Sequence, residues 1–268
     1  MSAPFDAAAP LYDDDLARQA PVFDRLRRVI RGAFTAWLPP GGWIIDLGCG
    51  AGADTLWLAE RGWRVVAVDP SPAMLAGVGA AARARGLSAS VRLHLSTAAA
   101  LWEGWPADMP PLVGCVSSLG PLNCEGDLRP VARGLARLLP PGAPAVLSPM
   151  ARICPWEIAV FLLRAEPRRA LARLSPGPAA APVSSGAPGV TIPTWYPSPR
   201  AFVDPFRGAF HLKAQRGLGV FLPPPWLGRA ARWPRALDAL DALDERLAGR
   251  WPLSGLGDHS LFVLERAG

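Results

Sequence analysis

The stretch that decides the fold is residues 44–54, IIDLGCGAGAD, together with residues 65–69, VVAVD. An apolar strand runs into a glycine turn, a helix follows, and a second apolar strand ends in the carboxylate of Asp69. The glycines permit backbone angles closed to other residues and let the chain pass close to a ligand. Asp69 lies 17 residues beyond Gly52, near the spacing at which an acid accepts hydrogen bonds from ribose hydroxyls. The pattern predicts an adenosine-containing cofactor.

The identity of that cofactor depends on Asp46, because the glycines alone also satisfy the relaxed dinucleotide fingerprint. A nicotinamide-dependent oxidoreductase is therefore one alternative. Asp46 lies two residues before the first glycine, at the carboxyl end of the strand, where it would face the crevice that binds ligands in such sheets. A carboxylate there would repel a pyrophosphate but attract an ammonium and a sulfonium. This charge pattern favours S-adenosyl-L-methionine.

The chain here resembles the class I S-adenosylmethionine-dependent methyltransferases of the small-molecule type. Their first motif is an acid, any residue and three alternating glycines, matched by Asp46, Gly48, Gly50 and Gly52. The likeness continues through residues 69–75, DPSPAML, residues 112–123, LVGCVSSLGPLN, and residues 138–142, LLPPG, and covers roughly residues 10–150. It implies an α/β fold, with a doubly wound, Rossmann-like, mostly parallel seven-stranded sheet, a C-terminal antiparallel hairpin and helical insertions.

The resemblance also implies a set of cofactor-binding residues. One departure concerns the end of the third strand, where the family often has an aspartate that reads the adenine amino group and this chain has Ser96 and Thr97. A hydroxyl can accept the same hydrogen bond without the charge. The expected cofactor-binding residues are Tyr12, Asp46, Gly48, Cys49, Gly50, Gly52, Asp69, Pro70, Met74, Ser96, Thr97, Ser117 and Ser118.

Hydrophobic periodicity divides the chain into three parts. Residues 1–42 are expected to form a helical segment, with helix over 13–37; the family resemblance implies that it folds over the cofactor as a lid, and packing on the sheet alone is the alternative. Residues 43–150 form the cofactor-binding core, in which strands alternate with helices and share one carboxyl edge. Residues 151–268 carry the substrate-pocket insertions and the last two strands. The core strands are expected at 43–47, 64–68, 91–95, 112–117 and 144–148, and its helices at 53–61, 71–85 and 127–138.

The last part of the chain is expected to build the acceptor pocket. Helices are predicted at 155–173, interrupted at Pro167, and at 234–248. The tract 175–189, rich in Pro, Ala, Gly and Ser, is expected to be mobile or extended, and whether it acts as a lid is left open. Strands at 209–215 and 260–265 would supply the antiparallel pair.

Composition and charge bear on location, on metal or disulfide sites and on charged partners. No apolar run approaches the roughly 20 residues of a membrane span, and the N-terminus lacks a basic start followed by an apolar segment, so a cytoplasmic protein is expected. Cysteine and histidine spacing suggests no metal site and no disulfide framework. Residues 1–150 carry 13 basic and 13 acidic side chains, and residues 151–268 carry 15 and 9. The basic segment 200–235 could meet an acidic substrate, an anionic membrane surface or nucleic acid, although solvated surface is favoured and nucleic acid is not expected.

The acceptor is expected to be a small, apolar or aromatic molecule. Oxygen is favoured over nitrogen or carbon as the methylated atom. The pocket is expected to include Trp156, Trp195, Tyr196 and His211, with His259 as a candidate base and Asn123 as an orienting group. An RNA or protein methyltransferase and a noncatalytic cofactor binder remain alternatives, and the oligomeric state stays open.

Overall fold

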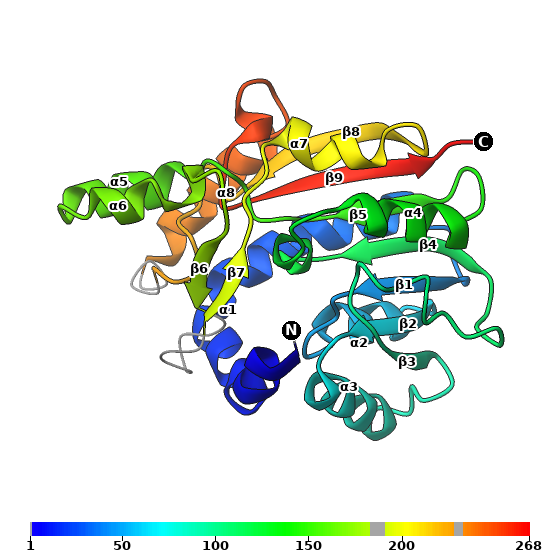
Figure 1. Cartoon of the computed structure of the whole chain (residues 1–268). Helices are drawn as coiled ribbons and strands as arrows, with labels where there is room; N and C mark the ends of the chain where they lie inside the picture. Colours follow the sequence, from blue (N-terminus) through cyan, green and yellow to red (C-terminus); the bar gives the residue numbers. More distant parts are fainter. Residues whose placement is uncertain (1, 183–190, 228–232) are drawn as a thin grey trace.

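The computed structural model describes residues 2–182, 191–227 and 233–268, with backbone only for residues 2–4, 7–20 and 182. Its centre is a seven-stranded sheet in the order β3-β2-β1-β4-β5-β9-β8 (Figure 1). The first five strands pair in parallel, and β9 pairs antiparallel with β5 and β8. The strands are β1 (Trp43–Leu47), β2 (Arg64–Asp69), β3 (Val91–Leu95), β4 (Leu112–Ser117), β5 (Pro144–Leu147), β8 (Phe210–Leu218) and β9 (His259–Arg266). The predicted α/β class and the C-terminal antiparallel pair are confirmed.

Helices cover both faces of this sheet because its strands are apolar on both sides. Ile44 and Val65 pack with α1 (Ser2–Trp37) and α8 (Pro234–Leu247), whereas Ile45 and Val66 pack with α4 (Arg129–Leu138) and α7 (Pro199–Val203). In Figure 1, α1 passes behind the strands. The helices are α1 (Ser2–Trp37), α2 (Ala53–Ala59), α3 (Pro72–Ala84), α4 (Arg129–Leu138), α5 (Pro155–Leu163), α6 (Pro167–Ala170), α7 (Pro199–Val203) and α8 (Pro234–Leu247). No helix within the described ranges is both long and apolar enough to cross a bilayer.

The differences from the sequence expectations fall mainly outside the core. α1 begins at Ser2 rather than at residue 13. The helix expected over 155–173 is divided into α5, α6 and a 3₁₀ turn at Ala172–Leu174, because Pro167 lacks the N–H that would continue the hydrogen-bond ladder. Part of the tract 175–189 is extended, as β6 (Ala179–Pro182), and pairs antiparallel with β7 (Thr191–Thr194). Residues 183–190 lie outside the described chain.

Parallel pairing brings the carboxyl ends of β1, β2, β4 and β5 to one edge of the sheet, which we call the carboxyl edge. Because β9 is antiparallel, it begins at this edge with His259. The start of α1 and the β6–β7 pair lie on the same side of the molecule (Figure 1). The Oγ of Ser71, just after β2, donates a hydrogen bond to Asp6 of α1 at 2.5 Å. The N-terminal helix therefore reaches the edge where the expected cofactor residues gather.

Candidate active site

The glycine turn after β1 is held against β2. The backbone N–H groups of Gly48 and Cys49 donate to the carbonyl of Val68 at 2.8 and 3.0 Å. Gly48 and Gly52 have φ angles of +75° and +82°. A Cβ on Gly48 would lie 2.2 Å from the Cβ of Pro121, and a Cβ on Gly52 would lie 2.7 Å from a methyl group of Val78. These two glycines are therefore required by close packing of the protein as well as by their backbone angles.

Asp69 links the glycine turn to the start of α3. Its side chain is 7% exposed, and its two oxygens accept hydrogen bonds from the backbone N–H groups of Gly50 and Ser71, both at 2.9 Å. Burial raises the pKa of Asp69, and the two backbone hydrogen bonds partly oppose this increase. Each carboxylate oxygen can accept a second hydrogen bond, so ribose binding by Asp69 stays a prediction that the contacts allow.

Asp46 is almost fully buried, at 2% exposure, and faces the first turn of α2. One of its oxygens accepts a 2.5 Å hydrogen bond from the hydroxyl of Thr55. Burial and the nearby carboxylates of Asp54 and Asp69 raise the pKa of Asp46 to about 7, against the lowering effect of Thr55. Its position in the sequence predicts a side chain that faces an open crevice, whereas one of its oxygens is bonded to α2. Its direct role toward the methyl donor stays a prediction.

The start of α3 lies on the other side of Asp69 from the glycine turn. Ser71 is the N-cap of α3 and accepts a hydrogen bond from the N–H of Met74 at 3.1 Å, while its own hydroxyl donates to Asp6. Met74 is buried, and Pro70 is partly exposed beside it. Tyr12 belongs to α1 by its backbone, and its side chain lies outside the described part of the chain. Cys49 is partly buried, and burial raises the pKa of its thiol well above the usual value.

The segment after β3 is bonded by a carboxylate from another loop, which sequence reasoning missed. The hydroxyl of Ser96 donates to the carbonyl of Thr97, and the hydroxyl of Thr97 accepts from the N–H of Ala100. Glu125, from the loop after β4, accepts a hydrogen bond from the N–H of Ala99 at 3.2 Å, and burial raises its pKa. Glu125 thus places a carboxyl group where the resemblance leads us to expect an aspartate. The absence of an acid after β3 is the sequence signal that could have prompted a search for it.

Asn123 holds the loop after β4 in place rather than presenting its amide to an acceptor. Its NH₂ group donates to the carbonyls of Trp195 and Met150 at 2.7 and 3.2 Å, and its oxygen accepts from the N–H of Met150 at 2.8 Å. The N–H of Trp195 in turn donates to the carbonyl of Asn123 at 2.8 Å. Just before it, Leu119 has a φ of +60°, an uncommon angle for a non-glycine residue. Asn123 therefore fixes the loop after β4 against Met150 and Trp195.

Three buried polar atoms at the carboxyl edge have no hydrogen-bond partner within the described part of the chain. They are the hydroxyl oxygens of Ser118 and Ser148 and the Nδ1 of His259. Ser118 and Ser148 directly follow the adjacent strands β4 and β5, and His259 forms a bridge with Met150. Ser117, by contrast, donates to the carbonyl of Leu47 at 2.8 Å. We call Ser118, Ser148 and His259 the polar row.

The side chains of the polar row share one face of the sheet. Val116 and Val146, two residues before the two serines, pack in the cluster that includes α1, and so does Leu261, two residues after His259. Because side chains alternate along a strand, all three polar side chains continue on the α1 side. Buried polar atoms without partners are uncommon, and a water or a ligand is one explanation for them.

A buried ion-pair network lies beside His259. The guanidinium of Arg173 binds Glu157 at 2.7 Å and Asp258 at 2.8 Å, and donates to the carbonyls of Ala151 and Asp258. Burial opposes the charge of Arg173, but the two carboxylates outweigh it and raise its pKa. The pKa of Asp258 is lowered because His259 and Arg173 outweigh its burial. Asp258 Oδ2 lies 3.2 Å from His259 Nδ1, although the ring N–H is not aligned for a hydrogen bond.

The same network includes three side chains whose ligand-type atoms lie within 4.8 Å of one another, those of Cys154, Glu157 and Asp258. The spacing resembles a cation site. Arg173 already supplies the positive charge between the two carboxylates, and burial raises the pKa of Cys154 to about 12, so that the thiol keeps its proton. The cluster is accounted for by the ion pairs.

The residues expected to line the acceptor pocket do not all lie together. The ring of Tyr196 lies under the Arg173 guanidinium at 5.2 Å, and Trp195 packs beside Gly126 next to Asn123. Trp156 donates to the carbonyl of Phe221 at 2.7 Å. The expectation for His211 is wrong. His211 is exposed and lies opposite Glu265 in the β8–β9 register. Glu265 in turn lies opposite Pro144, the first residue of β5, so His211 is at the edge of the sheet opposite the carboxyl edge.

Several basic side chains of segment 200–235 are paired with other groups of the protein. Arg207 pairs with Asp204 at 3.0 Å, and Lys213 pairs with Glu265 at 3.2 Å. Arg216 donates to the carbonyl of Asp244 at 3.0 Å. Arg200 and Arg235 are exposed, and Arg229 and Arg232 lie outside the described residues. The pairing is consistent with an ordinary solvated surface.

Comparison with known proteins gives a family and several structures of the same fold. Residues 44–142 match the model of a methyltransferase domain. A search of curated proteins finds no match. Three similar solved structures are a methyltransferase from Mesorhizobium loti, a geranyl diphosphate C-methyltransferase from Streptomyces coelicolor and the [4+2]-cyclase SpnF.

The three likenesses extend over most of each chain. The Mesorhizobium protein is 24% identical, with 88% of this chain and 96% of that chain covered and a TM-score of 0.56. The Streptomyces enzyme is 14% identical, with 91% of this chain and 80% of that chain covered and a TM-score of 0.55. SpnF is 16% identical, with 90% of this chain and 81% of that chain covered and a TM-score of 0.55. At these identities the three structures show a shared fold, and only the matched domain indicates the type of reaction. Residues 44–142 therefore carry a methyltransferase domain, and the chain as a whole shares the fold of these three solved structures.

Proposed function

We propose that the chain methylates an oxygen atom of a small, largely apolar acceptor. The observation that carries this proposal is the polar row, because an acceptor hydroxyl would supply hydrogen bonds that Ser118 and Ser148 lack. Tyr196, which lies against Arg173, and Trp195, which bonds Asn123, supply apolar surface that would suit such an acceptor. The geranyl diphosphate C-methyltransferase among the structural neighbours also acts on a small molecule with a large apolar part, although on carbon.

The donor side fits S-adenosylmethionine by its chemistry. Asp69 has free acceptor capacity toward ribose hydroxyls, and Asp46 brings negative charge near the expected position of the sulfonium and ammonium groups. We propose that Glu125 replaces the missing aspartate in reading the adenine amino group. When bound, S-adenosylmethionine supplies an electrophilic methyl group on its sulfonium. The proposed division of labour is that residues 1–42 cover the donor, residues 43–150 bind it and residues 151–268 select the acceptor.

His259 is proposed to take the proton of the acceptor hydroxyl. Asp258, whose lowered pKa keeps it ionised, lies beside Nδ1 and would stabilise the positive charge that His259 gains. Nε2 would then be the nitrogen that accepts the proton. Ser118 and Ser148 would hold the acceptor oxygen in line with the methyl group, and this positioning supplies much of the acceleration.

The test uses labelled S-adenosylmethionine and a panel of small phenols, alcohols and amines. His259→Gln should lower kcat by about 10²–10⁴-fold, the usual contribution of a positioned base, and leave donor affinity unchanged. His211→Gln is the matched control, because His211 lies at the opposite edge of the sheet, and it should keep full activity. Equal activity of the two variants would remove His259 from the mechanism. Methylation of amines or carbon only would reject oxygen as the acceptor atom.

A further inference from the structure

The helices α5 and α6 project from the carboxyl-edge side of the molecule (Figure 1). Their exposed side chains are unusually apolar. Leu163 is 88% exposed, Leu162 53% and Leu171 51%. We call residues 162–171 the α5–α6 tip. Isolated exposed leucines are ordinary, but several on one short projecting element mark an interaction surface.

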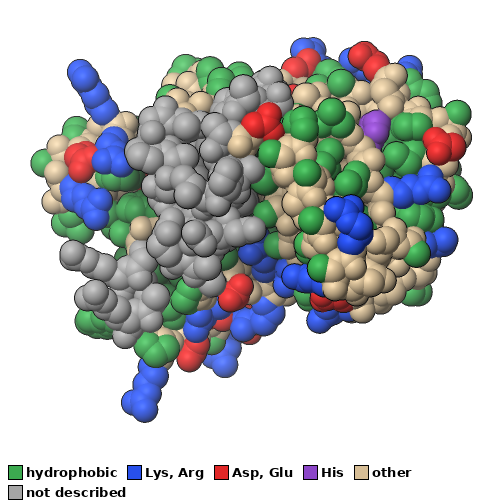
Figure 2. All heavy atoms as spheres, turned by 90° about the horizontal axis from the view of Figure 1, so that it is seen from below, with side chains coloured by type: hydrophobic (Ala, Val, Ile, Leu, Met, Phe, Trp, Pro, Cys, Tyr) green, Lys and Arg blue, Asp and Glu red, His purple; other side chains and the backbone are tan. Residues whose placement is uncertain are grey.

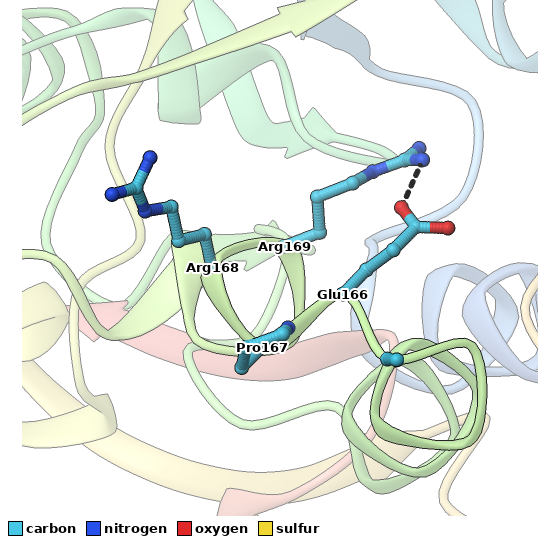
Figure 3. Close-up of a pocket in the computed structure, with 5 residues that line it drawn as sticks. Glu166, Pro167, Arg168 and Arg169 are labelled. Carbon is cyan, nitrogen blue, oxygen red and sulfur yellow. Dashed lines mark hydrogen bonds and ion pairs between the residues drawn. The ribbon is translucent and has the colours of Figure 1, made fainter.

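Basic side chains surround these leucines. Arg164, Arg168 and Arg169 are exposed, and the acid in the tip, Glu166, pairs with Arg169 at 2.6 Å. Figure 3 shows Arg168 and Arg169 pointing in different directions from the turn, with Glu166 bound to Arg169. The residues from Ala165 to Arg169 also line an open hollow of about 380 Å³. In Figure 2, this end of the molecule shows blue basic groups beside green hydrophobic ones.

The tip is held rigidly by its base. Phe161 stacks on Trp226 with ring centroids 5.3 Å apart, and Arg169 lies 4.3 Å from the Phe161 ring centroid. Below it, the buried guanidinium of Arg173 binds Glu157 of α5 and Asp258 at the start of β9. The exposed leucines are therefore presented by an ordered element joined to the carboxyl edge.

We propose that the α5–α6 tip docks on an anionic lipid bilayer, with its leucines in the interfacial region and its arginines at the headgroups. Apolar side chains flanked by Arg are typical of elements that lie in a membrane interface, and the positive charge complements anionic lipid. A protein partner fits less well, because helices of nine and four residues fall short of the roughly 800 Å² per partner that a stable protein interface buries.

The experiment is co-sedimentation of the full chain with vesicles of phosphatidylcholine alone or mixed in equal parts with phosphatidylglycerol. We expect binding to the anionic vesicles only, weakened by added salt. The double variant Leu162→Ser, Leu163→Ser should bind at least about tenfold less because its apolar surface is lost. Arg168→Gln should bind about fivefold less, the contribution of one basic residue near an anionic surface.

Trp251→Ser is the matched control, because Trp251 is 90% exposed but lies in the loop between α8 and β9. It should bind as the unchanged protein does. The proposal is overturned if the unchanged chain stays in the supernatant, if the double serine variant binds equally well, or if Trp251→Ser loses as much. Self-association without vesicles that disappears in the double variant would assign the tip to a second copy of the chain instead. None of these outcomes depends on methyl transfer.

Discussion

Two halves of the carboxyl edge differ in how their polar groups are satisfied. In the donor half, at the ends of β1 and β2, Asp46 and Asp69 are hydrogen-bonded to Thr55, Gly50 and Ser71. In the acceptor half, at the ends of β4 and β5 and the start of β9, the two hydroxyls and the Nδ1 of the polar row have no partner among the residues that the structure describes, although Arg173 nearby is fully bonded. In the donor half the two carboxylates therefore already accept hydrogen bonds from the chain, whereas in the acceptor half the three atoms of the polar row accept or donate none among the described residues.

The largest effect is expected from breaking the support of the acceptor half. Arg173→Ala leaves the carboxylates of Glu157 and Asp258 buried without their cation, and should lower the free energy of unfolding by about 3–5 kcal/mol. Urea unfolding followed by circular dichroism measures this loss. Arg168→Ala, at an exposed position, should change it by less than about 0.5 kcal/mol. A similar stability for both variants would mean that the network does not support the acceptor half.

Next, Gly48→Ala tests whether the donor half depends on close packing. Both Gly48 and Gly62 have positive φ angles, but a Cβ would lie 2.2 Å from Pro121 at position 48 and would meet nothing within 4 Å at position 62. Gly62→Ala should cost about 1–2 kcal/mol from backbone strain alone. Gly48→Ala should cost about 1–3 kcal/mol more, since Pro121 must move. Equal losses in thermal or urea unfolding would show that packing at Gly48 contributes nothing.

A pH series sharpens the role of Asp46, whose pKa is raised to about 7 by burial and neighbouring carboxylates. If the ionised carboxylate attracts the donor, affinity for S-adenosylmethionine should fall about tenfold for each pH unit below about 7. Calorimetric titration at several pH values measures this slope. Asp46→Asn should flatten it, and Thr55→Val should shift it to higher pH by removing a hydrogen bond that lowers the pKa. A pH-independent affinity in the unchanged chain would contradict the charge argument.

The same raised pKa has a consequence for stability with a definite sign. The unfolded carboxyl of Asp46 loses its proton near its ordinary value of 3.8, before the folded one does. Between about pH 4 and 7 the folded state therefore binds more protons, and the free energy of unfolding should fall as pH rises. Urea unfolding across this range should show a smaller decline in Asp46→Asn than in the unchanged chain. An identical decline in both would assign the slope to other groups.

The smallest effect is expected from two buried serines, one hydrogen-bonded and one without a partner among the described residues. Ser117→Ala removes the hydroxyl that bonds the carbonyl of Leu47 and should cost about 1 kcal/mol. Ser148→Ala removes a hydroxyl without a partner and should leave the stability unchanged or raise it by up to about 1 kcal/mol. In the methyl-transfer assay the ranking of the two variants should reverse. Ser148→Ala should raise the KM for the acceptor, whereas Ser117→Ala should not. Equal stability losses would show that Ser148 is already bonded in solution.

Local sequence patterns predicted most of the core. The strands β1, β3 and β4 have the bounds expected from apolar runs and glycine turns, because such signals act within a few residues. The residues of the donor half could be predicted from the sequence for the same reason. Asp69 bonds a neighbour two residues away, and Asp46 bonds one nine residues away. The failure at His211 has the opposite origin, since its position depends on strand pairing across more than 50 residues.

The sequence by itself determined the α/β class, the order of the core elements and the chemistry of the methyl donor, because these depend on local periodicity and on a short motif. Only the tertiary structure decided that Glu125 reaches the segment after β3, that Asn123 binds Trp195 and that Arg173 binds Asp258. The last two contacts join residues 72 and 85 positions apart. Such contacts form when packing brings distant segments together and buries their polar groups, which then require partners.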